Sequence, residues 1–128
     1  MTTPISIVES FIAGWAPNQA AMYEAFRRYF TAQTVWENVG VATTTGIDEA
    51  IGFFEGFPMK IDHIKVDMLA IAANGNVVLT ERIDHLCGKD GKILLSLKLM
   101  GIFEVQGGKI SKWRDYFDTA TLFKMMQG

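Results

Sequence analysis

The stretch from Val77 to Asp118 reads VVLTERIDHLCGKDGKILLSLKLMGIFEVQGGKISKWRDYFD, and it decides the fold. Apolar and polar side chains alternate along most of it, and Asp90-Gly91 and Gly107-Gly108 divide it into three runs. Alternation favours half-buried strands, and dipeptides of this kind favour tight hairpin turns. The stretch therefore predicts an antiparallel meander with strands over 77–87, 93–106 and 109–118.

The residues upstream add strands to this sheet. The period of two begins near Ile61, so a further strand is predicted over about 61–72, and the Asn74-Gly75 turn joins it to the meander. A short strand is predicted over 34–38. Four successive strands and one early strand require a cover on one face of the sheet, because a sheet buries its apolar face against another layer.

Helices are expected to provide that cover. Apolar residues at helical spacing predict a helix over 4–15, which Thr3 caps, and a second helix over about 19–30, which Asn18 caps. Thr45 is expected to cap a third helix, which ends at Gly56 and Pro58. Residues 119–126 are expected to form one or two helical turns. Helices before a meander predict an α+β fold.

Composition limits the class of protein. The chain has 128 residues, of which 49% are hydrophobic and 20% charged, and its formal net charge is −2. We expect one domain over residues 1–128, because domains most often have ~100–150 residues. The charge does not favour nucleic-acid binding, and no apolar run reaches the ~18–20 residues of a membrane helix. With no visible signal peptide and one cysteine, Cys87, we expect a cytoplasmic protein.

Metals and nucleotide cofactors are not expected. The two histidines, His63 and His85, are isolated, and no His or Cys pair has the spacing of a metal site. No glycine-rich phosphate loop follows a predicted strand, since Gly107-Gly108 is typical of a hairpin turn. The sequence therefore predicts no cofactor.

Strand alternation places several polar side chains on the inward face. Lys98 should point to solvent, so its neighbours Leu97 and Leu99 should point inward. If they do, four polar residues are expected to converge among apolar side chains: Arg82, Asp84, Asp115 and Asn38. Leu86 and Phe117 share this inward face with the leucines, and these four apolar residues either line a pocket or fill the core.

The expected cluster of charges has two interpretations. Buried charges persist when they are paired and hydrogen-bonded, and one arginine can offer its planar fork to two carboxylates. The cluster is then a structural ion pair between strands. Alternatively it is a functional site, because two carboxylates near one arginine in an apolar cavity acquire different proton affinities. The residues alone leave both interpretations open.

The deciding stretch resembles a known enzyme family. The segments Thr80–Asp84 and Trp113–Asp118 are similar to the two hallmark strands of the limonene-1,2-epoxide hydrolases, and Trp36–Gly40 also fits. The resemblance covers roughly Phe11 to Phe123. It implies a SnoaL-like, nuclear-transport-factor-2-like fold (a cystatin-like roll), in which three N-terminal helices cover a cone-shaped curved mixed or antiparallel sheet around an apolar pocket.

The resemblance also implies a catalytic set. Asp115 matches the general base that activates a water, and Asp84 matches the acid that protonates the epoxide oxygen. Arg82 matches the arginine that bridges the two carboxylates, and Asn38 matches a residue that holds the water. Ring opening would be one concerted step to a vicinal diol, without a covalent intermediate or a metal.

Trp36 departs from the pattern of this family. The family usually has Tyr two residues before the Asn, where the hydroxyl also contacts the water. An indole N–H donates a hydrogen bond but cannot accept one, and the ring is larger. We expect Trp36 to occupy this water-positioning place, where it either reshapes the pocket or impairs hydrolysis.

Three functions follow as hypotheses. The leading one is a hydrolase that opens a small or medium apolar epoxide to a vicinal diol. A related isomerase or polyketide cyclase, with one Asp as proton shuttle, is the second, and a module that binds a hydrophobic ligand or a protein partner without catalysis is the third. In each case the resemblance implies a homodimer, with Met100 and Ile102 as candidate contacts.

Overall fold

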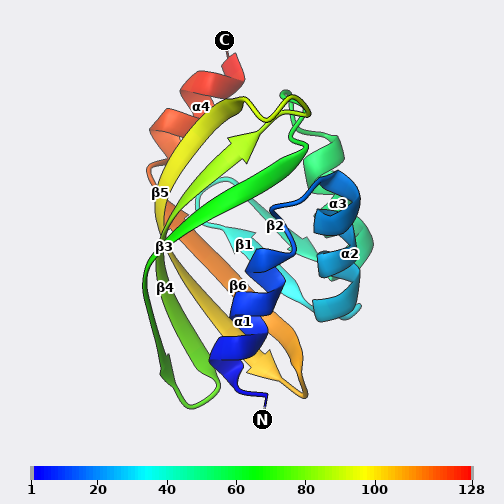
Figure 1. The fold of residues 1–128 in the computed structure, drawn as a ribbon, viewed down its shortest axis with the longest axis vertical. Coiled ribbons are helices and arrows are strands. Elements are labelled where there is room, and N and C mark those ends of the chain that lie inside the picture. The colour runs from blue at the N-terminus through cyan, green and yellow to red at the C-terminus, as the bar shows by residue number, and fades with distance from the viewer. Residues whose placement is uncertain (1, 128) are drawn as a thin grey trace.

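The computed structural model describes residues 2–127, in which four helices pack around one curved, six-stranded sheet (Figure 1). The helices are α1 (Pro4–Ala13), α2 (Gln19–Tyr29), α3 (Gly46–Glu55) and α4 (Thr119–Gln127). The strands are β1 (Val35–Asn38), β2 (Ala42–Thr45), β3 (His63–Asn74), β4 (Val77–Cys87), β5 (Ile93–Gln106) and β6 (Lys109–Phe117). The expected α+β class and helical cover are confirmed.

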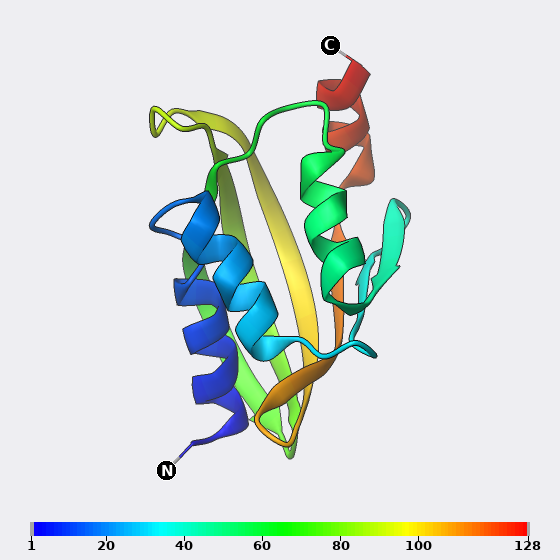
Figure 2. The same cartoon turned by 90° about the vertical axis from the view of Figure 1, so that its right-hand side faces the viewer.

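The sheet order is β2-β1-β6-β5-β4-β3. Strands β3 to β6 form the expected antiparallel meander, whereas β1 pairs with β6 in parallel, so the sheet is mixed. Figure 2 shows α1, α2 and α3 in front of the sheet, with α4 beside α3 at one end. Within residues 2–127, none of the helices has the length and apolar character of a membrane-spanning helix.

Most element ends agree with the sequence, and the exceptions have local causes. Strand β2 was not predicted, because its four residues are too few to show a period of two. Thr3 and Asn18 accept hydrogen bonds from the backbone of Ser6 and Ala21, as expected of caps. Thr45 is the N-cap of α3 but makes no side-chain cap, so that expectation was wrong. Instead its backbone N–H donates to Glu49 Oε1 at 3.0 Å.

The core lies between the helices and the concave face of the sheet. Phe11 of α1 is its centre, because its ring contacts those of Trp15 and Phe26 at centroid distances of 5.1 Å and is fully buried. Leu97 and Leu99 point into this space while Lys98 is exposed, which confirms the inward face predicted from alternation.

Candidate active site

A row of aromatic side chains crosses three strands and supports the site. The register places Phe103 of β5 beside Trp113 of β6, and Trp113 beside Trp36 of β1. The rings stack, with centroid distances of 5.1 Å from Phe103 to Trp113 and 4.6 Å from Trp113 to Trp36. The near-parallel Trp pair, at 7°, holds Trp36 firmly against the sheet.

The next row along the strands is polar. The register aligns Thr80, Gly101, Asp115 and Asn38 from four strands. Gly101 has no side chain, and Arg82 uses the free space: a Cβ there would lie 2.5 Å from Arg82 Nη1 and would also clash with Asp115 Oδ1. Glycine within a strand often marks such a close approach. The polar row therefore forms because Gly101 lets the guanidinium reach across β5.

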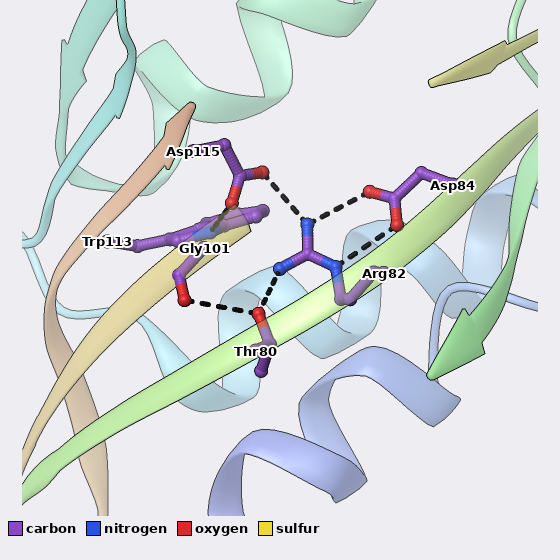
Figure 3. Close-up of polar contacts among 6 residues, drawn as sticks. All are labelled: Thr80, Arg82, Asp84, Gly101, Trp113 and Asp115. Carbon is purple, nitrogen blue, oxygen red and sulfur yellow. Dashed lines mark hydrogen bonds and ion pairs between the residues drawn. The ribbon is translucent and has the colours of Figure 1, made fainter. Parts of the chain in front are cut away.

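Arg82 joins the two carboxylates (Figure 3). Its Nε and Nη2 donate to the two oxygens of Asp84 at 3.1 and 3.0 Å, and Nη2 also donates to Asp115 Oδ2 at 3.0 Å. Its Nη1 donates to Thr80 Oγ1 at 2.9 Å, and Thr80 donates to the Gly101 carbonyl. The guanidinium is fully buried, so these partners replace its water.

The two acidic residues differ in their surroundings. Besides Arg82, Asp115 accepts a hydrogen bond from Trp113 Nε1 at 2.7 Å. Burial raises the pKa of Asp115 to about 6 although Arg82 lowers it, and the nearby Asp84 carboxylate raises it further. Burial lowers the pKa of Arg82, but Asp115 and Asp84 more than offset this and hold it above its usual range. The arginine thus stays charged, while Asp115 is a stronger base than an ordinary carboxylate.

An inner cavity of about 60 Å³ lies over this cluster. Asp84, Asp115, Asn38 and Trp36 line it, and so do the four predicted pocket residues Leu86, Leu97, Leu99 and Phe117. One water needs ~10–15 Å³ of such volume, and an engineered cavity that binds benzene has ~150 Å³. The inner cavity thus has room for several waters or one small organic group.

Arg82 does not line the inner cavity. It lies behind the two carboxylates, and it can act on a ligand only through them. Trp36 is only 4% exposed, and within residues 2–127 its Nε1 has no hydrogen-bond partner. The structure thus brings together all the site residues that the sequence predicted. Arg82, however, is placed to orient the two carboxylates and not to contact a ligand in the cavity.

Three residues of the site were not singled out for it from the sequence. Gly101 gives the guanidinium its space, Thr80 orients it, and Trp113 donates a hydrogen bond to Asp115. An isolated glycine inside an alternating strand was the available signal for Gly101. For Trp113, the signal was its position two residues before Asp115, which puts both side chains on one face.

Together these features define a class: a nuclear-transport-factor-2-like cone with a carboxylate–arginine–carboxylate cluster under an apolar cavity. An NTF2-like protein of unknown function from Burkholderia pseudomallei K96243 shares the fold, with a TM-score of 0.79 and 16% identity over all of both chains. The sequence model of the limonene-1,2-epoxide hydrolase catalytic domain matches residues 2–127, and the chain belongs to that family.

Two relatives are similar in sequence. The epoxide hydrolase EphG of Mycobacterium tuberculosis (strain ATCC 25618 / H37Rv) is 36% identical over 90 residues, which are 70% of this chain and 58% of that protein. The chain thus matches little more than half of that relative. The structure of an LEH-like epoxide hydrolase from M. tuberculosis has a TM-score of 0.75 and 30% identity, and the match covers 97% of this chain and 84% of that one.

Proposed function

We propose that this protein is an epoxide hydrolase that adds water to a small apolar epoxide and releases a vicinal diol. The observation that carries the proposal is the pair of carboxylates, Asp84 and Asp115, which share one buried guanidinium and both line the inner cavity. Membership of the family and the similarity to epoxide hydrolases support the same reaction.

The reaction is a single concerted step. Asp115 takes a proton from the water while the water oxygen bonds to one epoxide carbon. In the reactive form the pair holds one proton, on Asp84, while Asp115 is ionised. The C–O bond of that carbon breaks, and Asp84 gives this proton to the departing oxygen. One proton then returns from Asp115 to Asp84 through cavity water. The pKa of about 6 suits Asp115 as the base, because such a carboxylate is ionised at neutral pH yet accepts a proton more readily than an ordinary one.

Asn38 and Trp36 are proposed to hold the attacking water. The water can donate one hydrogen to Asp115 and one to the Asn38 carbonyl oxygen, and it attacks with one lone pair. Its other lone pair is free to accept from Trp36 Nε1, whose buried N–H has no partner within residues 2–127. An indole can thus position the water through donation alone, although it offers no acceptor.

The apolar residues around the cluster are proposed to select the substrate. Leu86, Leu97, Leu99 and Phe117 offer no hydrogen bonds, so they favour the hydrocarbon part of an epoxide. They also exclude bulk water, which strengthens the charge interactions of the two carboxylates. The cavity volume of about 60 Å³ favours epoxides with few carbons.

The test is diol formation from small aliphatic epoxides in ¹⁸O-labelled water. The wild type should place one labelled oxygen in the diol, and Asp115→Asn and Asp84→Asn should each lower kcat by about 10²–10⁴-fold. No turnover by the wild type, or full activity of Asp115→Asn, would contradict the proposal. Activity on a ketosteroid or polyketide ester that survives Asp84→Asn would favour an isomerase or cyclase, and tight binding without turnover would favour a binding module.

We also propose that two copies associate through the outer face of the sheet. Leu69, Met100 and Tyr116 are each about half exposed on β3, β5 and β6, while the other candidate contact, Ile102, is half-buried. Exposed apolar side chains that gather on one face mark an association surface. Light scattering should give a dimer mass, and Met100→Glu should give a monomer; a monomeric wild type would contradict this.

The proposed location is the cytoplasm. It is the simplest one for a chain whose one cysteine, Cys87, is buried and free within the described residues. Cell fractionation tests it, with recovery in the cytoplasmic fraction as the expected result and recovery outside that fraction as the contrary one.

A further inference from the structure

A second and larger space adjoins the inner cavity. This outer hollow has a volume of about 420 Å³ and lies among α2, the end of α3, the connection of residues 56–62 and the β4–β5 turn. Figure 2 shows that connection crossing the end of the cone from α3 to β3. Phe54, Phe57 and Ile61 line both spaces, so these three side chains form their common wall.

The small volume of the inner cavity means that a longer substrate must cross the common wall. The inner cavity, at about 60 Å³, is smaller than the ~150 Å³ that accepts benzene, so an epoxide with a chain of several carbons exceeds it. The remainder of such a molecule has to pass the common wall. Phe57 is half-buried, whereas Phe54 and Ile61 are buried. Phe57 is therefore the side chain of this wall that can most easily change its rotamer and open a passage.

The outer hollow differs from the inner cavity in charge. Five titratable groups line it: Tyr23, Glu55, Lys60, Asp62 and Lys89. Asp62 already has a hydrogen-bond partner, because its Oδ2 lies 2.9 Å from His63 Nδ1. Within residues 2–127, neither lysine has a carboxylate partner within 4.0 Å. Burial, with the Glu55 carboxylate second, raises the pKa of Tyr23, so its hydroxyl remains a donor. Two ammonium groups and one hydroxyl thus face two carboxylates, of which Asp62 already has His63 as a hydrogen-bond partner.

We propose that the inner cavity and the outer hollow form one bipartite substrate site, and that the substrate is an amphipathic epoxide with a carboxylate at its far end. The epoxide end lies over Asp84 and Asp115, the chain passes Phe57, and the carboxylate lies between Lys60 and Lys89. This inference rests on the proposed hydrolase function and extends its substrate: the epoxide end in the inner cavity is small and apolar, and a charged end is added beyond Phe57.

The kinetic test compares 5,6-epoxyhexanoate with 1,2-epoxyhexane, which has the same chain length and no charge. The wild type should have the higher kcat/KM for the acid. The double variant Lys60→Met/Lys89→Met should raise KM for the acid about tenfold, because two exposed ion pairs contribute about that factor, and should leave kcat and the apolar substrate unchanged. Lys112→Met, at an exposed lysine outside the hollow, is the matched control.

Two results would overturn the bipartite site. One is equal or lower kcat/KM for the acid in the wild type, and the other is an equal rise of KM in Lys112→Met. Binding of hexanoate, which has no epoxide, separates this inference from the proposed function. If the wild type turns over neither epoxide, the hydrolase function fails, and the hollow is still supported by hexanoate binding that weakens in the double variant and is overturned by binding that does not change.

Discussion

The two faces of the sheet carry two clusters that look alike in residue type. On the concave face, Arg82 joins Asp84 and Asp115. On the outer face, His85 Nε2 lies 2.9 Å from Asp67 Oδ2, and its Nδ1 lies 2.7 Å from Ser96 Oγ. The outer cluster contains the residue types of a Ser–His–Asp hydrolase, whereas the inner one contains two carboxylates and an arginine.

Surroundings distinguish the clusters more than chemistry does. The Asp67 side chain is 61% exposed, and the outer cluster does not line the inner cavity. Ser96 is itself exposed and pairs with His85 across β4 and β5, so the outer cluster is open to solvent. The inner carboxylates are over nine-tenths buried beside a cavity. A reactive site here requires burial and space.

Of the substitutions on the two faces, removal of the Arg82 guanidinium should cause the largest loss of stability. Arg82→Met leaves two buried carboxylates without a positive partner, so it should lower the free energy of unfolding by about 3–5 kcal/mol at pH 7.5. Urea denaturation measures this. The loss should shrink at pH 5, where Asp115 is protonated more readily; a loss below about 1 kcal/mol at pH 7.5 would show that the guanidinium is not needed.

The pH dependence of stability should come from the inner face. The folded pKa of Asp115, about 6, lies above its ordinary value of 3.8, so the folded state binds more protons between these values. Stability should therefore fall as pH rises from 4 to 6, by on the order of 2–3 kcal/mol relative to Asp115→Asn, and change little above pH 7. Thermal denaturation of both proteins tests this, and parallel curves would contradict it.

The close approach at Gly101 should be the next most sensitive feature. Gly101→Ala puts a methyl group where Arg82 Nη1 and Asp115 Oδ1 lie, so the guanidinium must withdraw. We expect a loss of about 1–3 kcal/mol in unfolding free energy and a larger proportional loss of kcat than of substrate binding. Gly75→Ala, with open space around it but a positive φ, is a control for the cost of replacing a glycine. Wild-type kcat in Gly101→Ala would contradict the account.

The outer cluster should show the smallest effect. His85→Ala removes an exposed pairing, so the unfolding free energy should change by about 0–1 kcal/mol and diol formation should not change. Ser96→Ala should behave in the same way. A loss of turnover in either variant would move the chemistry to the outer face.

The sequence predicted the parts of the site that depend on local periodicity. Long half-buried strands alternate clearly, so the inward positions of Arg82, Asp84 and Asp115 could be derived before the structure was known. The close approach of Arg82 to Gly101 and the stacking of Trp113 on its neighbours in β5 and β1 could not be, because they depend on the register between strands. Alternation does not fix that register.

The outer hollow was beyond prediction for a related reason. Its lining comes from α2, α3, a connection and a turn, which are far apart in the sequence and have no common pattern. The role of Arg82 shows the same limit. Its side chain is inward, as predicted, but only the three-dimensional arrangement shows that it lies behind the carboxylates rather than beside the cavity.

The central claim is that Asp115 on the concave face is the base, and the pH dependence of kcat/KM for diol formation tests it most directly. We expect a bell-shaped profile: kcat/KM rises tenfold per pH unit up to about pH 6, where Asp115 ionises, and falls again at higher pH, where the pair no longer holds the proton that Asp84 donates. Because a histidine titrates in the same range, His85→Ala and His63→Ala serve as controls and should keep the rising limb unchanged. A profile that is flat from pH 5 to 8, or a limb that disappears with either histidine, would contradict the account.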